Sequence, residues 1–301
     1  MGWDDGGCSA IGVSELLAFH SGLAKHLLVV IKAYCDGGNL CDSRVHETAT
    51  IACIIGRPTV FRTFERHWKV NLRKHKVAYL HTTDAVSFKG IYAKWWDEDD
   101  VKGSKARRDA FLRDCGNIIA GCALQCDEPK EKLPSTLVPM SVTLNLSDFK
   151  RAQLQPSGPQ DATEILATQA LSHVVDCASI FKSHFIELFF DRNEPYRGHV
   201  DDRVRNGKFL AEMKARGMDL QRYMLLHPPL DMRDVPELQA ADLFAWAVEN
   251  TKPIRFDWQH VLLRIPSTLA ERIDYDLLQK ADPLVEALAK HCNFPKRRAT
   301  P

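Results

Sequence analysis

The chain has 301 residues, of which 40 are Lys or Arg and 39 are Asp or Glu, so its formal net charge is +1. Hydrophobic residues make up 45% and charged residues 26% of the sequence, a composition that excludes disordered and collagen-like chains. The near-neutral charge argues against a protein that coats nucleic acid through its overall charge, although a local basic face is compatible with it.

The sequence predicts a cytoplasmic protein. Its apolar runs, such as Leu27 to Ile31, are far shorter than the roughly 20 residues of a membrane-spanning helix. The first residues contain Asp4 and Asp5 but no Lys or Arg, unlike a secretory signal. Nine cysteines without a regular spacing predict buried, unpaired thiols in a reducing compartment.

The predicted elements begin with a short helix over Ser14 to His26. A strand over Leu27 to Tyr34 follows, ended by the turn sequence Asp36-Gly37-Gly38-Asn39, and a second strand covers Glu47 to Ile55. The gap is too short for a crossover helix, so these strands should pair antiparallel. A Rossmann fold is disfavoured, because it requires a helix after the first strand and the fingerprint G-x-G-x-x-G is absent.

The stretch from Arg57 to Ser135 is predicted to be an insertion. It contains a basic helix over Val60 to Lys76, a short strand over Val77 to His81 and a second helix around Ala106 to Leu124. The segment from Asp127 to Pro139, rich in Pro, Lys and Glu, is typical of a linker.

After the insertion the pattern becomes regular, with strands and helices in alternation. The predicted elements are a strand over Ser141 to Leu146, a helix over Ala162 to Ala178, a strand over Phe185 to Phe190, a polar helix over Val200 to Arg216, a strand over Gln221 to Leu226 and a helix over Val235 to Asn250. This order predicts an α/β fold, with a ribonuclease H-like mixed sheet flanked by helices and a helical insertion between strands two and three.

The domain organisation follows from this order of elements. The expected parts are an N-terminal extension over 1–26, a core over 27–56 and 136–252, the insertion over 57–135 and a C-terminal helical extension over 253–301.

Three aspartates form the candidate catalytic and metal-binding set. Asp36 follows the first strand, Asp191 follows the strand ending at Phe190, and Asp242 lies inside the last helix. In a ribonuclease H-like sheet these positions converge, and divalent cations relieve the repulsion between crowded carboxylates. An all-oxygen set suits Mg²⁺ or Mn²⁺, and two such ions could clamp the attacking water and the leaving oxygen of a phosphodiester.

Each aspartate also has a simpler explanation. Asp36 before two glycines is common in tight turns, and Asp191 could start a loop. Asp242 borders the apolar stripe of its helix, where an unpaired charge is costly, so it is the sharpest of the three candidates.

Four further residues are candidates for the same site. Gln239 lies one turn before Asp242 on the same side of the helix. Glu164 is a candidate fourth carboxylate, although an acid in the first turn also favours the helix dipole. His81 and Asp84 could orient a substrate or water, whereas a lone His at a strand end is more often structural.

Basic residues provide a candidate substrate surface. Four of them share one face of the helix over Val60 to Lys76, and two follow Asp191, where guanidinium groups suit phosphate recognition. A solvated helix face is the commoner explanation of such a stripe. The substrate-binding candidates are Arg62, Arg66, Lys69, Arg73, Arg192 and Arg197.

The segment Leu238-Gln239-Ala240-Ala241-Asp242 and the apolar residues after it resemble the C-terminal motif of the domain-of-unknown-function family numbered 3800. In that family the motif is a Gln, two small or apolar residues and an Asp, followed by an apolar helix. The strands ending near Asp36 and Asp191 are similar to the family's other acidic positions, and Leu80 to Asp84 is similar to its His-containing segment. After the first Asp this chain has Gly37-Gly38-Asn39, where the family typically has Glu-Ser-Gly.

The resemblance covers roughly Val30 to Asn250 and implies a ribonuclease H-like fold with a nuclease-like, metal-dependent site. The leading hypothesis is therefore a hydrolase of phosphodiester bonds in DNA or RNA that uses Asp36, Asp191 and Asp242 with Mg²⁺ or Mn²⁺. The alternative is a non-catalytic nucleic-acid- or protein-binding member of a ribonuclease H-like family, which the altered loop after Asp36 favours. A hydrolase with a Ser or Cys nucleophile is less favoured, because G-x-S-x-G is absent.

Overall fold

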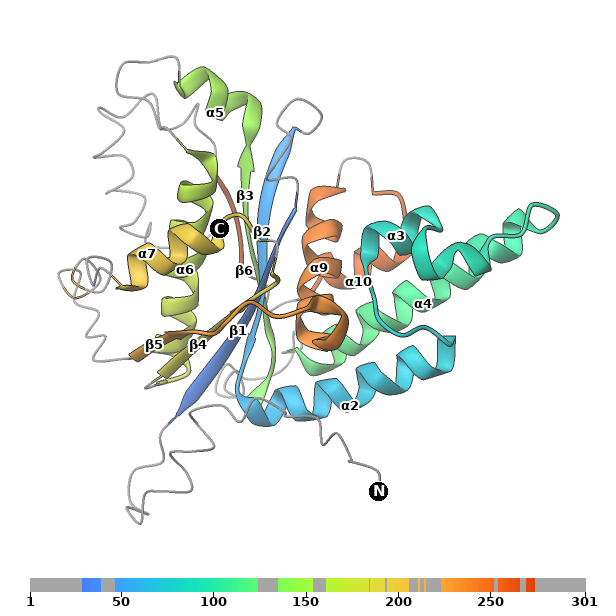
Figure 1. Ribbon diagram of the computed structural model, residues 1–301, viewed down its shortest axis with the longest axis horizontal. Coiled ribbons are helices and arrows are strands. Elements are labelled where there is room, and N and C mark those ends of the chain that lie inside the picture. Colours follow the sequence, from blue (N-terminus) through green and yellow to red (C-terminus); the bar gives the residue numbers. More distant parts are fainter. Residues whose placement is uncertain are drawn as a thin grey trace, which may run out of the picture.

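A six-stranded sheet forms the centre of the computed structural model (Figure 1). The strands are β1 (Val30–Gly38), β2 (Thr48–Gly56), β3 (Val138–Asn145), β4 (Phe185–Phe190), β5 (Tyr223–Leu226) and β6 (Leu269–Ile273), in the spatial order β5-β4-β1-β2-β3-β6. The structure describes residues 29–38, 47–123, 135–153, 161–183, 185–192, 194–205, 211, 214, 223–251, 254–265 and 269–273. The helix predicted over Ser14 to His26 lies outside these residues.

The sheet is mixed, as the sequence predicted. β2 pairs antiparallel with β1 and with β3, whereas β4 is parallel to β1, β5 to β4 and β6 to β3. β2 is therefore the one described strand that runs against the others. The antiparallel pairing predicted from the short gap between the first two strands is confirmed.

The structure corrects two predictions about strands, and the first correction matters for the site. β1 continues to Gly38, and Asp36 pairs with Ala52 of β2, so Asp36 lies within a strand and not in a turn. The C-terminal extension is not purely helical, because Leu269–Ile273 forms β6, which adds a parallel strand beside β3.

Helices cover both faces of the sheet (Figure 1). One face carries α5 (Leu146–Gln153), α6 (Ala162–Ile180) and α7 (Arg197–Arg205). The other face carries α2 (Pro58–His75), α3 (Thr82–Ser87), η1 (Gly90–Trp95), α4 (Val101–Cys122), η3 (Met232–Asp234), α9 (Pro236–Glu249) and α10 (Asp257–Leu263). The sheet with helices on both faces is an α/β architecture.

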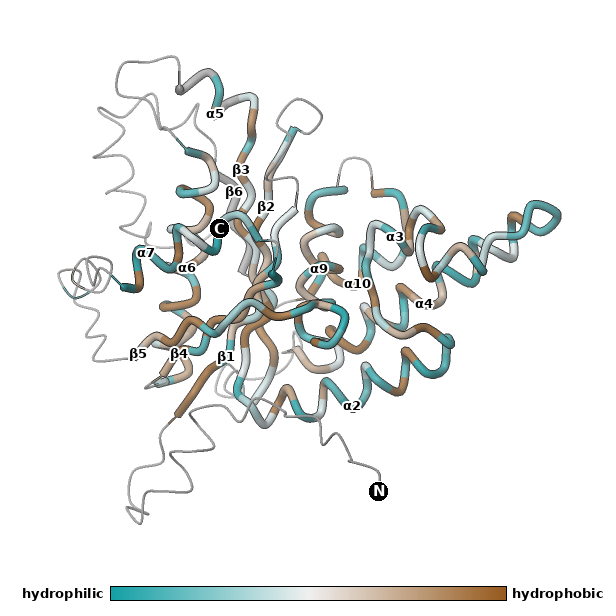
Figure 2. The backbone as a smooth tube through the Cα atoms, viewed as in Figure 1, coloured by the Kyte–Doolittle hydropathy of each residue, from teal (hydrophilic) through white to brown (hydrophobic). Residues whose placement is uncertain are grey.

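Alternation along the strands divides the core into two layers. In β1, Ile31 and Ala33 pack towards α6, whereas Tyr34 belongs to the apolar cluster around α9. Figure 2 shows the hydrophobic residues concentrated along the strands. Because successive side chains of a strand point to opposite faces, Asp36 lies on the same face as Tyr34 and therefore towards α9.

The insertion packs against the sheet and shares its core with the C-terminal helices. Trp68 of α2, Phe111 of α4, Phe244 of α9 and Trp258 of α10 are all fully buried in one apolar cluster. Residues 77–81 do not form the predicted strand, since the N–H of Leu80 donates to Oε1 of Gln239 and not to a neighbouring strand.

Two cysteines differ from the prediction of unpaired thiols. Cys35 and Cys53 lie directly opposite each other on β1 and β2, with their Cα atoms 4.1 Å apart, and form a disulfide. Cys115, Cys122 and Cys177 are free thiols. Within the described ranges, no helix is both long and apolar enough to cross a membrane.

Candidate active site

Four carboxylates gather where β1 and β4 end beneath α9. Asp36 is near the end of β1 and only 6% exposed, and Asp191 follows β4 and forms a bridge with Leu230. Asp242 lies in the middle of α9, and Glu194 comes three residues after Asp191. The negative charges of Asp191, Asp242 and Glu194 all act on Asp36, so the three predicted aspartates do converge, together with a fourth acid.

The side chains of Asp36 and Glu194 form a hydrogen bond. Burial raises the pKa of Asp36 well above its usual range, and the charges of Glu194 and Asp242 raise it further. Burial also raises the pKa of Glu194, to about 7, although the bonds from Asp36 and from the backbone of Gly37 lower it. Burial and the neighbouring negative charges thus favour the protonated form of the Asp36 carboxyl group, next to which Glu194 lies within hydrogen-bonding distance.

The other two carboxylates accept backbone hydrogen bonds. Oδ2 of Asp242 accepts from the N–H of Thr82 at 2.7 Å, and Oδ1 of Asp191 accepts from the N–H of Met232 at 2.9 Å. Burial raises the pKa of Asp242, whereas the nearby His81 and the Thr82 N–H lower it. Each aspartate thus has one oxygen that is oriented by the protein backbone.

A pocket of about 320 Å³ opens beside Asp36 and Asp242, whereas Asp191 and Glu194 are not among its described lining residues. Its walls include Asp36, Gly38, Asp242, Trp246, Glu249 and Asn250. Among the described residues that line it there is no Lys or Arg, so the pocket is acidic.

Glu249 enters this pocket across the end of β1. Its carboxylate occupies the space that a Cβ at Gly38 would need, so a side chain at position 38 would force the carboxylate to move. Burial raises the pKa of Glu249 to about 8, the charge of Asp242 adds to this, and a bond from the backbone of Thr50 lowers it. Gly38 thus leaves room for an acid from α9.

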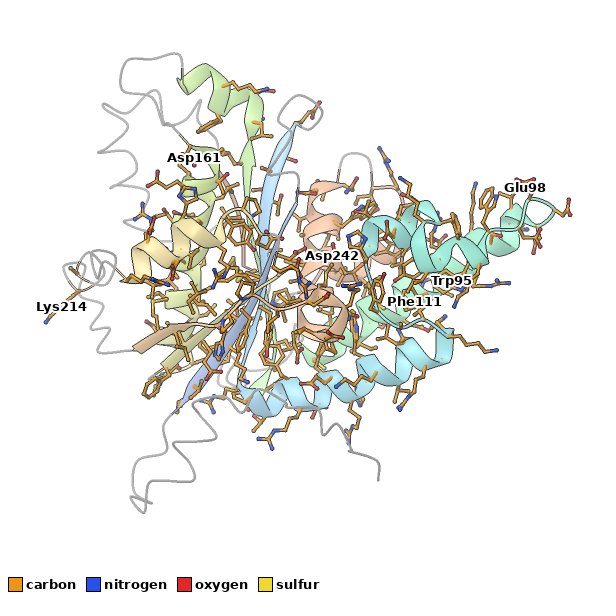
Figure 3. The ribbon with its side chains drawn as sticks, in the orientation of Figure 1. Trp95, Glu98, Phe111, Asp161, Lys214 and Asp242 are labelled. Atoms are coloured by element: carbon orange, nitrogen blue, oxygen red, sulfur yellow. A yellow bond between two sulfur atoms is a disulfide. The ribbon has the colours of Figure 1, made fainter. Side chains whose placement is uncertain are left out.

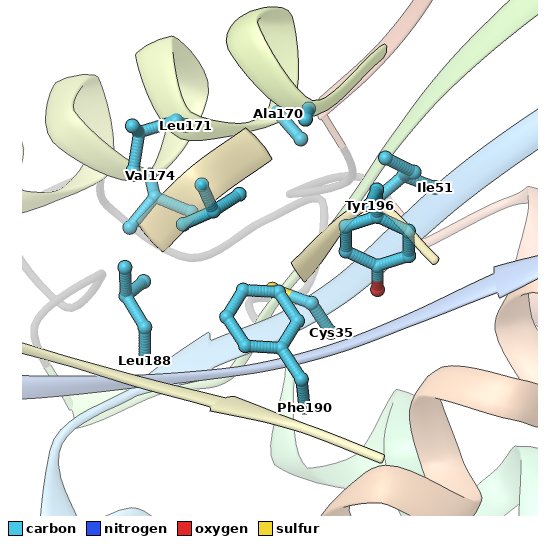
Figure 4. Close-up of a pocket in the computed structure, with 10 residues that line it drawn as sticks. Cys35, Ile51, Ala170, Leu171, Val174, Leu188, Phe190 and Tyr196 are labelled. Atoms are coloured by element: carbon cyan, nitrogen blue, oxygen red, sulfur yellow. The ribbon is translucent and has the colours of Figure 1, made fainter. Parts of the chain in front are cut away.

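Tyr196 lies under the carboxylates on the other side of the sheet end. It is fully buried, its ring contacts Phe190 edge-on at 5.4 Å between centroids, and it lines a small apolar cavity with Cys35 (Figure 4). Burial raises the pKa of Tyr196, and the charges of Glu194, Asp36 and Asp191 raise it further. In the described part of the chain its hydroxyl group has no hydrogen-bond partner, so the O–H can donate to a ligand of the carboxylates.

Gln239 lies one turn before Asp242, but its side chain is used within the protein. Oε1 accepts from Nε1 of Trp68 at 2.8 Å and from the N–H of Leu80 at 2.9 Å. Nε2 donates to the carbonyl groups of Met232 and Arg233 at 3.0 and 3.2 Å. Gln239 therefore joins α2, η3 and the segment before α3, and positions the site without lining the pocket.

His81 and Asp84 lie near the edge of the pocket. Nδ1 of His81 is 3.0 Å from Oδ2 of Asp84, and the two side chains are 37% and 32% exposed. Both charges act on Asp242, and the neighbouring Thr83 lines the pocket.

The structure does not bring Glu164 to the carboxylates. Glu164 begins α6, on the other face of the sheet, and pairs with Arg203 at 3.2 Å. Figure 3 shows Asp161, the N-cap of α6, on the opposite side of the sheet from Asp242. Glu194 is the fourth acid instead. Its signal in the sequence was a second acid three residues after Asp191 at the end of a buried strand.

The predicted basic residues lie outside the pocket. Arg62, Arg66, Lys69 and Arg73 are exposed on α2, and none of the described pocket-lining residues comes from that helix. Arg192 pairs with Asp231 at 2.9 Å, and Arg197 donates to the carbonyl group of His227 at 3.2 Å.

The donor set of the site has the chemistry of a divalent-cation site. Carboxylate oxygens are the ligands that Mg²⁺ and Mn²⁺ prefer, and the unpartnered hydroxyl of Tyr196 lies close to three of them. Within the described residues, no three His, Cys, Asp or Glu side chains are already arranged as ligands around one point. The side chains of Asp36 and Glu194 instead form a hydrogen bond to each other, which a cation would have to replace.

Comparison with protein-family models gave no match, and no curated protein sequence is significantly similar to this chain. The resemblance to the domain-of-unknown-function family numbered 3800 thus stays a prediction based on the short segments described above.

Proposed function

We propose that the protein is a ribonuclease H-like, metal-dependent hydrolase that cleaves phosphodiester bonds in DNA or RNA. The strand order β3-β2-β1-β4-β5, with β2 antiparallel, supports the fold assignment, because it is the order expected of a ribonuclease H-like sheet. β6 and the helices between β2 and β3 are then additions to that sheet.

The observation that carries the proposal is the convergence of Asp36, Asp191, Glu194 and Asp242 beside an acidic pocket. Burial raises the pKa values of Asp36, Glu194 and Asp242, and repulsion from other acids of the cluster raises those of Asp36 and Glu194 further. A fold retains such an unfavourable cluster when it serves a function, and neutralisation by Mg²⁺ or Mn²⁺ is the function that fits all-oxygen donors.

In this proposal Asp36, Asp191, Glu194 and Asp242 would hold a divalent cation, and that cation would supply an activated water and stabilise the charge on the leaving oxygen. Asp191 and Asp242 are oriented for this role by the backbone N–H groups of Met232 and Thr82. Asp36 and Glu194 would bind the cation as carboxylates after losing any proton between them to solvent, and the Tyr196 hydroxyl, unpartnered among the described residues, would be available to donate a hydrogen bond beside them. His81 and Asp84, near the edge of the pocket, orient the substrate.

The second candidate is a non-catalytic protein that binds nucleic acid or another protein. The hydrogen bond between Asp36 and Glu194 favours it, because the two side chains can satisfy each other without a cation. The exposed basic face of α2 would then be the binding surface.

The experiment compares melting temperature and cleavage of fluorescently labelled single-stranded DNA and RNA in MnCl₂ and in EDTA. We expect Mn²⁺ to raise the melting temperature by several degrees and to permit cleavage, since ligand at about 100 times its Kd stabilises by about 2.7 kcal/mol. Asp36→Asn should lose both effects, whereas Glu164→Gln, which alters an exposed acid on the other face, should keep both. Oligonucleotide binding with neither a Mn²⁺ shift nor cleavage would instead establish the second candidate.

A further inference from the structure

Trp246 forms an aromatic wall of the acidic pocket. It lies four residues after Asp242 on α9, so the two side chains share one face of the helix. Its side chain is half-buried and is one of the residues that line the pocket. The pocket therefore combines carboxylates with the ring of a tryptophan.

Other aromatic rings hold Trp246 in place. Its ring centroid lies 5.4 Å from that of Trp258 and 5.9 Å from that of Phe256, and the latter two rings stack at an interplanar angle of 13°. Trp258 is fully buried, and the guanidinium of Arg108 lies over Phe256 at 4.6 Å. Because this arrangement already restricts the Trp246 ring, a ligand that stacks on it loses little additional entropy to ordering.

The chemistry of the pocket selects among planar ligands. Its described lining contains no Lys or Arg, so a phosphate can approach the carboxylates only with a cation between them. A nucleotide fits both the carboxylates and the tryptophan ring of the pocket. Its phosphate can bind the cation, and its base can stack on the aromatic ring. The volume of about 320 Å³ fits one nucleotide and not a duplex, in which each base is already stacked on its neighbours.

We propose that Trp246 is the stacking platform for an unpaired nucleobase next to the scissile phosphate, so that the pocket takes single-stranded or flipped-out nucleotides. This inference rests on the proposed function, because it assigns the phosphate of that nucleotide to the carboxylate site. It also assigns recognition of the nucleobase, which the carboxylates cannot recognise, to Trp246.

The test uses thymidine 5′-monophosphate, which has no internal phosphodiester bond to cleave, and deoxyribose 5-phosphate, which lacks the base. Each is added in MgCl₂ to the full-length protein while the indole N–H signals of its six tryptophans are followed by NMR. We expect the nucleotide to shift the signal of Trp246, identified by its loss in Trp246→Phe, and the abasic phosphate to leave it in place.

Affinities measured by calorimetry complete the test. Trp246→Ala should weaken nucleotide binding about 5- to 100-fold, which is the stacking contribution of one base, while Trp246→Phe should retain most of the affinity. The matched control is Trp96→Ala, which removes a 42% exposed tryptophan that does not line the pocket and should leave the affinity unchanged. The wild-type NMR titration decides the question even if Trp246→Ala fails to fold.

Failure of this inference differs from failure of the proposed function. If Mn²⁺ stabilises the protein and supports cleavage, but the Trp246 signal does not move with millimolar nucleotide, the stacking role is wrong and the hydrolase stands. If the nucleotide shifts Trp246 although no metal-dependent cleavage occurs, the base site stands and the hydrolase is wrong. Equal shifts with both ligands would also overturn the stacking role.

Discussion

Oδ2 of Asp242 accepts a 2.7 Å hydrogen bond from the N–H of Thr82, and Oε1 of Gln239, one turn earlier on α9, accepts one from Leu80 at 2.9 Å. The two side chains thus bind alternate amides of the extended segment that carries His81. This explains in physical terms why a Gln and an Asp are spaced three residues apart, since that spacing places both acceptors on one side of the helix.

Asp242→Asn should separate a metal-binding role from a purely structural one. Asn keeps an oxygen that can accept the Thr82 N–H but removes the negative charge. Because burial raises the pKa of Asp242, the charge is unfavourable without a cation, so in EDTA the variant should melt at the same temperature or higher. In MnCl₂ its thermal stabilisation and its nuclease activity should both be lost. Differential scanning calorimetry in the two buffers measures the effect.

A lower melting temperature in EDTA combined with a full Mn²⁺ shift would remove Asp242 from the ligand set. Asp242→Ala serves as the comparison, because it loses the acceptor as well. It should cost about 1 to 3 kcal/mol in EDTA through the unsatisfied Thr82 N–H.

The protein should become less stable in EDTA as the pH rises from about 5 to 8. Burial raises the pKa of Glu194 from 4.5 to about 7 and those of Glu237 and Glu249 to about 8. Between the pKa of each acid in the unfolded state and its raised pKa in the native state, the native state binds more protons than the unfolded state. The free energy of unfolding therefore falls as the pH rises, on the order of 1 to 3 kcal/mol per group. Urea unfolding at several pH values measures this slope, and a rise in stability over the range would contradict the assignment.

Two Gln variants compare the contribution of an acid in the site to this pH dependence with that of a buried acid elsewhere in the protein. Both Glu194→Gln and Glu237→Gln should flatten the slope, because each removes a buried acid. Glu194 forms a hydrogen bond with Asp36, whereas the charged neighbours of Glu237 are Glu65 and Lys32, so only Glu194→Gln should lose the Mn²⁺ shift.

Substitution of Gln239 should destabilise the protein strongly. Gln239→Leu leaves the buried N–H groups of Leu80 and Trp68 without their acceptor, at a cost of about 2 to 5 kcal/mol. Gln239→Glu keeps that acceptor but sets an oxygen against the carbonyl groups of Met232 and Arg233, so it should also destabilise. Urea unfolding measures both variants. A change of less than about 0.5 kcal/mol in Gln239→Leu would mean that these bonds are replaced by water.

Charge reversal on α2 tests whether its basic face binds nucleic acid. Replacing Arg62, Arg66, Lys69 and Arg73 by Glu should weaken oligonucleotide binding and reduce its dependence on salt concentration. Each lost phosphate contact lowers the slope of log K against log salt by about one unit. The control reverses Lys102, Lys105 and Arg107, which are exposed on α4. If the slope is the same as in the wild type, the α2 face is an ordinary solvated surface.

Much of the fold could be predicted because strong periodicity marks its elements. The predicted strand over Phe185 to Phe190 matches β4, and the last predicted helix differs from α9 by one residue at each end. The prediction failed at residues 77–81, where buried Val77 and Leu80 resemble a strand although Gln239, distant in sequence, takes the backbone bond. β6 was missed because its five residues alternate too briefly to indicate a strand.

The candidate site was predictable only where a local feature was unusual. Asp242 stood out because a charge beside an apolar helix stripe is unfavourable, but Glu194 sits among polar residues that look like any loop. Glu194 becomes part of the site through its hydrogen bond to Asp36, which depends on the pairing of β1 with β4. Glu249 was missed for a similar reason, since only the structure shows it entering the space above Gly38.

The contact between Gly38 and Glu249 has an evolutionary consequence. A Cβ at position 38 would displace that carboxylate, which is the end of a flexible side chain, so a substitution at one position changes the environment of the other. Lineages that acquired a side chain at position 38 should therefore have moved, shortened or replaced the one at position 249. In an alignment of descendants of one ancestor, positions 38 and 249 should therefore covary. Their identities would distinguish a branch with an acid from α9 at this place from a branch with a polar side chain at the end of β1.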